Sequence, residues 1–160
     1  MEEHREYVLR ALRASDAAAA AALIRTAFAA QTVATDPPPS ALRETSASVA
    51  ASLAEGGAIG AWAGEALAGC VIWQVQEHGL YLGRVSVHPD WRGRGIAPAM
   101  IAALEREARS RGLPRLLLST RLVLADNRRL FARCGFVETA QHAHPGYAQP
   151  TFVDMEKRLA

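Results

Sequence analysis

Residues 92–97 read Arg-Gly-Arg-Gly-Ile-Ala, a composition that could bind an anion. They stand between LYLGRVSV at 80–87, an apolar run typical of a strand, and AMIAALEREA at 99–108, which has the apolar spacing of a helix. Gly93 and Gly95 can adopt positive φ and let a ligand approach the main chain. A helix that begins here adds unpaired N–H groups and the positive end of its dipole. Together these features predict an anion site, most naturally for a phosphate.

Two common phosphate-binding motifs do not match this loop. A Walker loop needs Gly-Lys-Ser or Gly-Lys-Thr at the start of the helix, where this chain has Gly95-Ile96-Ala97. A dinucleotide fold needs Gly-x-Gly-x-x-Gly after an early strand, and Pro98 stands where the third glycine would fall. The loop therefore belongs to another class of phosphate site.

The hydrophobic pattern predicts the elements that hold the loop. Apolar runs and alternation indicate strands over 7–12, 58–64, 66–76, 80–87, 112–120, 136–141 and 150–159. Helical spacing indicates helices over 15–30, with Ser15 or Asp16 as the cap, and over 41–54, 97–111 and 125–135, with a proline-rich break at Thr35–Ser40. The order β-α-α-β-β-β-α-β-α-β-β predicts a mixed α/β sheet of about six to seven strands with helices on both faces. The loop lies at the end of a central strand, where ligands gather in such sheets.

Composition narrows the class of protein. The chain has 160 residues, 50% of them hydrophobic and 21% charged, with a net charge of +2. These values predict one domain over residues 1–160, and the balanced charge argues against a nucleic-acid partner. No apolar signal core and no run of membrane-spanning length is present, so we expect a cytoplasmic protein without a membrane partner. Cys70 and Cys134 are far apart in sequence, which favours two packed thiols over a disulfide or a zinc site.

The loop and its flanks resemble the acyl-CoA pyrophosphate motif of the GNAT superfamily, the Gcn5-related N-acetyltransferases. That motif reads Arg/Gln-x-x-Gly-x-Gly/Ala after a valine-rich strand, and here Arg92–Ala97 follows Val85-Ser86-Val87-His88-Pro89. The later NRRLFARCGF at 127–136 and the order of elements extend the resemblance over nearly the whole chain. The resemblance implies the GNAT fold and an N-acetyltransferase that transfers an acetyl group to a primary amine of a small molecule, an amino-acid derivative or a peptide. Acetyl-CoA would be the acyl donor, and no metal would be needed.

The resemblance also implies which residues bind the donor. Backbone amides of the loop would hold the CoA diphosphate, from Arg92, Gly93, Arg94, Gly95, Ile96 and Ala97. Main-chain groups of Val85, Ser86 and Val87 would bind pantetheine at a bulge where the family's central strand splays. The amide of Val85 would be the catalytic group that donates to the oxyanion, as a preorganised dipole.

Asn127 and Phe131 take positions that lie beside the pantetheine arm in the family. For Asn127 the alternative is a cap of the short helix together with Asp126. The family often has a tyrosine at the position of Phe131, which protonates the leaving thiolate, and phenylalanine carries no such proton. Three interpretations stay open. Solvent or another residue supplies the proton, the thiolate leaves unassisted, or the chain is an acyl-CoA binding or sensing module with weak or no catalysis.

The general base is not defined by the sequence. The candidates are polar residues around the central strand and in the last loop: Glu77, His78, Tyr81, His88, His142, His144 and Tyr147. Ordinary surface or turn roles are the alternative for each of them. Within HAHPGY we expect His144 and Tyr147 to contact the substrate, and no third ligand accompanies the two histidines for a metal.

We expect the acceptor amine between Thr35–Ser40 and the loop His142–Tyr147. Arg84 and Arg121 could recognise a carboxylate or a phosphate on the acceptor, with surface ion pairs as the alternative. The identity of the acceptor stays open. So does the oligomeric state, with a homodimer among the options.

Overall fold

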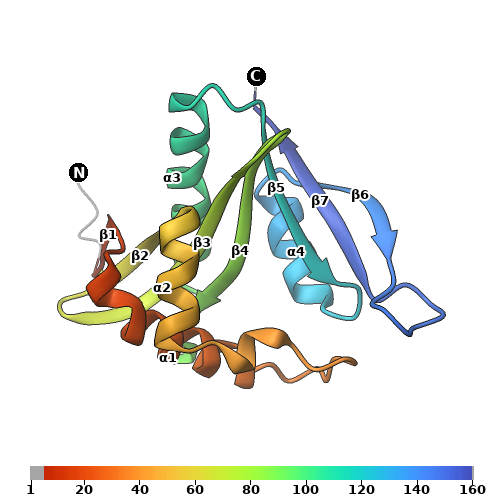
Figure 1. Ribbon diagram of the computed structural model, residues 1–160, viewed down its shortest axis with the longest axis horizontal. Coiled ribbons are helices and arrows are strands. Elements are labelled where there is room, and N and C mark those ends of the chain that lie inside the picture. Colours follow the sequence, from red (N-terminus) through yellow and green to blue (C-terminus); the bar gives the residue numbers. More distant parts are fainter. Residues whose placement is uncertain (1–5, 160) are drawn as a thin grey trace.

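The parallel pairing of β4 with β5 divides an otherwise antiparallel sheet (Figure 1). The computed structural model describes residues 6–159, and its sheet has the strand order β1-β2-β3-β4-β5-β7-β6. The strands are β1 Val8–Ala11, β2 Gly57–Ala63, β3 Ala66–Gln76, β4 Gly79–Val87, β5 Arg115–Arg121, β6 Val137–His142 and β7 Phe152–Arg158. The helices are α1 Ala17–Ala29, α2 Ser46–Glu55, α3 Ile96–Ser110 and α4 Ala125–Arg133, with 3-10 turns at Ala14–Asp16, Ser40–Arg43 and Pro89–Trp91. The predicted mixed α/β sheet is confirmed, with seven strands.

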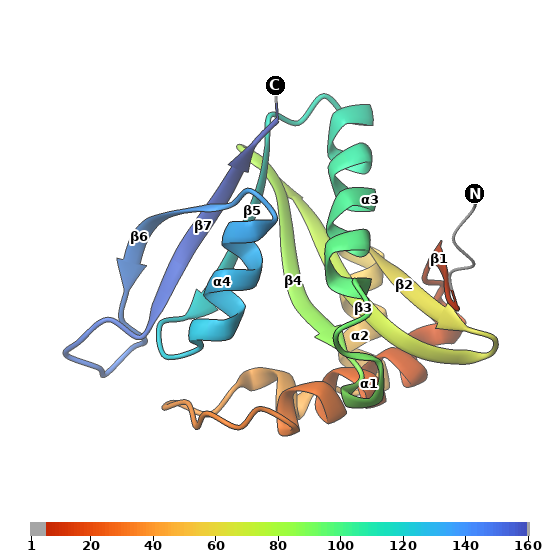
Figure 2. The same cartoon turned by 180° about the vertical axis from the view of Figure 1, so that it is seen from behind.

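Helices cover both faces of the sheet, as predicted (Figure 1, Figure 2). On one face, α1 and α2 bury Ile24 and Val49 against Ile72 of β3. On the other face, α3 buries Met100 and Leu104 against the central strands. The two hydrophobic clusters stabilise the sheet from opposite sides, because apolar surface removed from water contributes on both faces.

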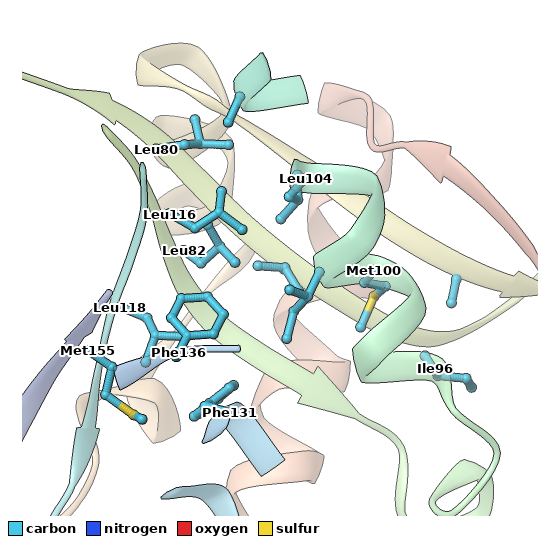
Figure 3. Packing of buried hydrophobic residues seen from close by; sticks show 14 of the residues in the cluster. Leu80, Leu82, Ile96, Met100, Leu104, Leu116, Leu118, Phe131, Phe136 and Met155 are labelled. Atoms are coloured by element: carbon cyan, nitrogen blue, oxygen red, sulfur yellow. The ribbon is translucent and has the colours of Figure 1, made fainter. Parts of the chain in front are cut away.

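The larger cluster brings the central strands, α3 and the α4 region together (Figure 3). The labelled side chains are Leu80, Leu82, Leu116, Leu118 and Met155 from the sheet, Ile96, Met100 and Leu104 from α3, and Phe131 and Phe136 from α4 and the residue that precedes β6. The α3 residues recur every three or four positions, which is the spacing of one helix face. This packing holds the start of α3, and with it the loop at 92–97, against the end of β4.

Strands β4 and β5 separate soon after they pair. Their register contains Leu80 with Leu116 and Tyr81 with Leu117. Beyond Tyr81, β4 has no register partner on β5, and both views show the two strands diverging. The main chain at the end of β4 therefore lacks the neighbour that a continuous sheet would supply on that side.

A bulge bends β4 in the same region. The register shifts between Cys70 and Ile72 of β3, so that Arg84 and Val85 of β4 stand opposite Val71 alone. Arg84 has a φ of 53°, the one positive φ at a non-glycine residue within 6–159. Such a conformation costs free energy and persists where the surroundings hold it. The extra residue bends the strand and increases its twist, which carries the end of β4 further from β5.

The structure moves two predicted helix boundaries. Segment 41–54 is not one helix, because Ser48 N–H donates to Thr45 Oγ1 at 3.1 Å and Thr45 N–H donates to Ser48 Oγ at 2.8 Å. This capping box starts α2 at Ser46 and leaves Ser40–Arg43 as a separate turn. Neither Ser15 nor Asp16 caps α1 through its side chain, since the Asp16 carboxylate accepts from Arg13 N–H at 2.8 Å in the preceding turn.

We predict that Gly79→Ala destabilises the fold at the point where β4 meets β5. A Cβ at Gly79 would lie 2.5 Å from the carbonyl oxygen of Arg115, a main-chain atom that cannot rotate away. A Cβ at Gly83, in the same strand, would find its nearest atoms at 3.7 and 3.8 Å. In urea unfolding, Gly79→Ala should lower the free energy of unfolding by about 1–3 kcal/mol, whereas Gly83→Ala should leave it unchanged or raise it by up to about 1 kcal/mol. Equal unfolding midpoints for the two variants would contradict this close approach.

Candidate active site

An open cleft of about 890 Å³, which we call the first cleft, lies between α3, α4 and the end of β4. Its volume is within the range of sites that bind small molecules and cofactors, about 300–1,000 Å³. It contains most residues predicted to bind the donor: Val85, Val87, Arg92, Gly93, Gly95, Ile96, Ala97, Asn127 and Phe131. Ser86 and Arg94 do not line it. Segments far apart in sequence thus meet at one open site.

The glycine loop has the backbone that an anion site requires. Gly93 and Gly95 have φ values of 76° and 75°, and Gly95 is the N-cap of α3. A Cβ at either glycine would have no atom within 4 Å, so a ligand can approach the main chain there. The first helical bond runs from Ala99 N–H to Gly95 O at 3.1 Å, which leaves the preceding amides without a partner within the helix. These amides belong to residues that line the first cleft, and free N–H groups at the start of a helix can bind a diphosphate.

The side chains of Arg92 and Arg94 are engaged within the protein. Arg92 Nη2 donates to the carbonyl oxygen of Ala27 at 3.2 Å and ties the loop to α1. Arg94 pairs with Glu6, and its guanidinium lies 4.5 Å from the centroid of the Trp91 ring. The side chain of Arg94 is thus engaged with Glu6 and Trp91 and does not line the first cleft. This arrangement agrees with an anion site built from peptide N–H groups.

The end of β4 presents alternate residues to the first cleft. Val85 and Val87 line it, whereas Ser86 is 1% exposed and its Oγ donates to the carbonyl oxygen of Arg84 at 2.9 Å. The side chains of successive strand residues point to opposite faces, so Ser86 turns into the protein. A donor contact by Ser86 would have to come from its main chain, as predicted from the sequence.

Helix α4 places Asn127 and Phe131 on the first cleft. Phe131 is 5% exposed and meets Phe136 edge to face, with ring centroids 6.1 Å apart. The N-cap of α4 is Leu124 and makes no side-chain cap bond, so the alternative interpretation of Asn127 as a helix cap is wrong. Asp126 pairs instead with Arg129 one turn along the helix. Asn127 is left facing the cleft, and its contact with pantetheine stays a prediction.

A second cleft of about 480 Å³ continues from the first. The two clefts share the lining residues Phe28, Gln31, Val85, Leu124, Asn127 and Phe131. The second cleft extends from this junction along β4 and β5 to the loop between β6 and β7. Val85 and Phe131 therefore stand at the place where molecules in the two clefts could meet.

The structure brings together the two segments predicted to enclose the acceptor. Tyr147 Oη donates to Asp36 Oδ1 at 2.5 Å, and Arg121 Nη1 donates to the carbonyl oxygen of Pro37 at 2.6 Å. The hydrogen bond to Asp36 raises the pKa of Tyr147 above its ordinary value. Tyr147 lines neither cleft, so its role in this structure is to join the two segments.

Arg84 and Arg121 both line the second cleft, and no carboxylate among residues 6–159 does. Arg84 Nη2 donates to Ser40 Oγ at 3.0 Å and lies 3.8 Å from the carboxylate of Glu44. These contacts hold Arg84 in its left-handed conformation at the bulge. Burial lowers the pKa of Arg121, and the nearby Tyr147 acts in the opposite direction. Arg121 keeps a cation in the cleft, because a guanidinium stays protonated at neutral pH.

Two of the candidate bases line the second cleft, Tyr81 and His144. The others line neither cleft: Glu77, His78, His88, His142 and Tyr147. His88 Nδ1 accepts from Asp90 N–H at 3.1 Å at the start of a 3-10 turn, which is the ordinary strand-end role. His142 Nε2 lies 2.7 Å from Asp154 Oδ2. Burial lowers the pKa of His144, and the charge of Arg121 acts in the same direction.

Three residues beside the second cleft were missed from the sequence: Glu44, Thr151 and Asp154. Glu44 pairs with Arg84, Thr151 hydrogen-bonds to His144, and no sequence motif marks either residue. Asp154 accepts from Ser119 Oγ at 2.7 Å, and both residues face the same side of the sheet. The sequence held one signal for Asp154. Alternate residues of a strand lie on the same face, so Asp154 of β7 shares a face with Phe152, which lines the second cleft.

Other kinds of site find little support in the part of the chain that the structure describes. No group of three or more His, Cys, Asp or Glu within 6–159 is placed to hold a metal ion. No helix within 6–159 is long and apolar enough to cross a membrane. Both cysteines are free, as the sequence predicted, and burial raises the pKa of the Cys70 thiol to about 12, with Glu44 acting in the same direction. Such a thiol is a poor nucleophile at neutral pH.

Comparison with known protein sequences identifies the family of this chain. The model of the acetyltransferase (GNAT) family matches residues 21–136. An acetyltransferase of Photorhabdus laumondii is 45% identical over 58 residues, which are 36% of this chain and 36% of that protein. An acetyltransferase of Sodalis glossinidius is 54% identical over 41 residues, 26% of this chain and 27% of the relative. These matches thus cover about a third or less of each relative's length.

Comparison with solved structures gives the same fold. The GCN5-related N-acetyltransferase from Rhodopseudomonas palustris superposes with a TM-score of 0.80 at 21% identity, over 99% of both chains. The putative acetyltransferase yncA from Salmonella typhimurium, solved with its cofactor acetyl-CoA, has a TM-score of 0.71 at 18% identity, over 96% of this chain and 94% of that one. The seven-stranded sheet, in which β4 and β5 separate, is consistent with the family match over residues 21–136. The chain belongs to the acetyltransferase (GNAT) family.

Proposed function

We propose that this chain is an N-acetyltransferase that uses acetyl-CoA to acetylate a primary amine of a small molecule, an amino-acid derivative or a peptide. One observation carries the proposal: the two clefts join at Val85, where β4 has left β5. A donor in the first cleft and an amine in the second would meet at this junction. Reacting groups held in contact react much faster than groups free in solution.

The residues of the first cleft fit the donor. The amides around Gly95 would bind the diphosphate, and Val85 and Val87 would flank the pantetheine arm. The amide of Val85 would donate to the thioester carbonyl oxygen as negative charge develops there. Because the bulge and the core packing set the direction of this dipole in advance, little reorganisation would accompany the reaction.

A second candidate function rests on Phe131. Its ring stands at the junction of the clefts and offers no proton to a leaving thiolate. A chain that binds acyl-CoA as a sensor would need the first cleft but not a proton donor at its end. The two functions are separated by following free thiol release from acetyl-CoA against a panel of amines, amino acids and peptides. Release that depends on the amine supports the enzyme, and tight acetyl-CoA binding without release supports the sensor.

The lining of the second cleft favours an anionic group on the acceptor. Its charged side chains within the described residues are Arg84 and Arg121, apart from the titratable His144. Arg84 already pairs with Glu44, which leaves Arg121 as the better partner for a carboxylate or phosphate near the amine. Such charge-assisted pairs are about twice as strong as neutral hydrogen bonds.

Gly95→Val should abolish CoA binding, because a branched side chain would fill the space that the diphosphate needs. Gly112→Val is the matched control, since Gly112 has a φ of 68°, an open surrounding and a place outside both clefts. Both variants carry the same backbone strain of about 1–3 kcal/mol. Isothermal titration calorimetry should show lost affinity for Gly95→Val alone, and unchanged affinity there would overturn the diphosphate assignment.

Phe131→Tyr should raise turnover, because it places a proton donor where the two clefts join. The gain should be at most the ~10²–10⁴-fold typical of general acid catalysis. Phe136→Tyr adds the same hydroxyl to the neighbouring ring, which lines neither cleft, and should bring no gain. Steady-state thiol release at saturating acetyl-CoA makes the comparison. If the folded Phe131→Tyr variant binds acetyl-CoA and turns over no faster, thiolate protonation does not limit the reaction.

Arg121→Ala should weaken the preference for acceptors that carry a carboxylate or a phosphate. The wild-type chain should acetylate such amines at least ~10-fold more efficiently than neutral hydrophobic amines, since one charge-assisted hydrogen bond contributes about 1.5–3 kcal/mol. Arg158→Ala removes an exposed arginine of β7 that lines neither cleft, and this variant should keep the preference. Equal kcat/KM for both classes of amine in wild type and in Arg121→Ala would show that the acceptor is not recognised by its charge.

A further inference from the structure

We propose that His144 is the general base that takes a proton from the acceptor ammonium at Nε2, and that Thr151 is the residue that positions its ring. The proposal rests on the function proposed above and names a group that the reaction needs. A primary amine is protonated at neutral pH and cannot attack a thioester until one proton is removed. His144 lines the second cleft, where the amine would lie.

Thr151 contacts both the main chain and the ring of His144. Thr151 Oγ1 accepts from the His144 backbone N–H at 3.0 Å, and it also contacts His144 Nδ1. The hydroxyl has a single proton, which it donates to the carbonyl oxygen of His142 at 3.5 Å. We propose that Nδ1 is the protonated nitrogen that donates to Thr151, which leaves the basic lone pair on Nε2.

Aromatic contacts hold the plane of the ring. The centroid of Phe152 lies 4.9 Å from that of His144, with the two planes at 64°. The ring of Tyr147 lies at 6.2 Å and 67°. Both are edge-to-face arrangements, which are favourable for aromatic pairs. Together with Thr151 they fix the orientation of the imidazole on the wall of the second cleft.

The charges around His144 keep it neutral at physiological pH. Burial lowers its pKa, and the guanidinium of Arg121 on β5 lowers it further. The Tyr147 hydroxyl is occupied by the Asp36 carboxylate, and His142 pairs with Asp154 on β7 rather than with His144. A neutral imidazole can accept a proton, whereas a charged one cannot.

No other lining residue is equally suited. Tyr81 presents a phenolic hydroxyl, which donates a proton more readily than it accepts one. The two carboxylate oxygens of Asp154 are occupied by Ser119 and His142. Asp154 also lies outside the lining of the second cleft.

The proton transfers balance over the reaction. The ammonium R–NH₃⁺ gives one proton to His144 Nε2, and the imidazolium returns it to water. The amine nitrogen attacks the thioester carbonyl carbon, so that a C–N bond forms and the C–S bond breaks with its electron pair on sulfur. The nitrogen loses a second proton, and the thiolate gains one. The sum is acetyl-CoA plus R–NH₃⁺ giving CoA–SH, the N-acetyl amine and one proton.

The pH dependence of kcat/KM tests this role. A base that acts on the ammonium form makes kcat/KM flat between two pKa values. The lower is the pKa of His144, which lies below its ordinary value, and the upper is the pKa of the amine. His144→Gln should lose about 10²–10⁴-fold at pH 7 and should instead rise about tenfold per pH unit, because only free amine then reacts. His142→Gln, at the end of β6 and outside both clefts, should keep the wild-type profile. A His144→Gln variant with the wild-type rate and profile overturns the proposal.

A spectroscopic measurement tests the positioning by Thr151 without activity. Imidazole ¹⁵N chemical shifts of the wild-type chain should show His144 protonated at Nδ1 and unprotonated at Nε2. Thr151→Val should give a mixture of the two His144 tautomers and should lower kcat more than it changes KM. Thr151→Ser keeps the hydroxyl and should show the wild-type tautomer and the wild-type kcat. Protonation at Nε2 in the wild-type chain, or a wild-type rate in Thr151→Val, overturns the assignment. If the wild-type chain binds acetyl-CoA but acetylates no amine, the proposed function itself fails.

Discussion

The separation of β4 from β5 is the constraint on which the site depends. The two strands pair at Leu80–Leu116 and Tyr81–Leu117 and then diverge. A continuous sheet would bury its interior strands, with every main-chain group of β4 paired and no space between them. Because the pairing ends early, the main chain of Val85 lies where the two clefts join, and helices α1 and α4 can both reach it.

Several distant contacts hold the strands apart. On one face, Leu82 of β4, Met100 of α3 and Phe131 of α4 belong to one hydrophobic core beside the split. On the other face, Arg84 is strained at φ 53° and is held by Ser40 and Glu44 from the segment before α2. The strain at Arg84 is therefore offset by contacts with a part of the chain that also borders the second cleft. The contacts of Arg84 with Ser40 and Glu44 thus stabilise the bulge and also border the second cleft. This explains why Arg84, which was considered for substrate binding, is engaged within the protein.

The sequence predicted the features that depend on local pattern. Hydrophobic period and glycine spacing indicated the element order and the positive φ of Gly93 and Gly95, because these follow from residues close in sequence. Contacts between distant segments were not predictable in the same way. Glu44 reaches Arg84, Tyr147 reaches Asp36, and Thr151 holds His144, yet none of these pairs carries a motif. The interpretation of Asn127 as a cap failed because α4 begins earlier, with Leu124 as its N-cap. Segment 41–54 is not one helix because the capping box of Thr45 and Ser48 starts α2 at Ser46.

A crystal structure of this chain with acetyl-CoA tests the central claim most directly. We expect the diphosphate on the amides at 92–97 and the pantetheine beside Val85 and Val87. The thioester carbonyl oxygen should lie within hydrogen-bond distance of the Val85 N–H. The acetyl group should point through the gap between β4 and β5 into the second cleft. A donor bound elsewhere, or one whose thioester faces away from Val85, would contradict the claim that the split sheet creates the site.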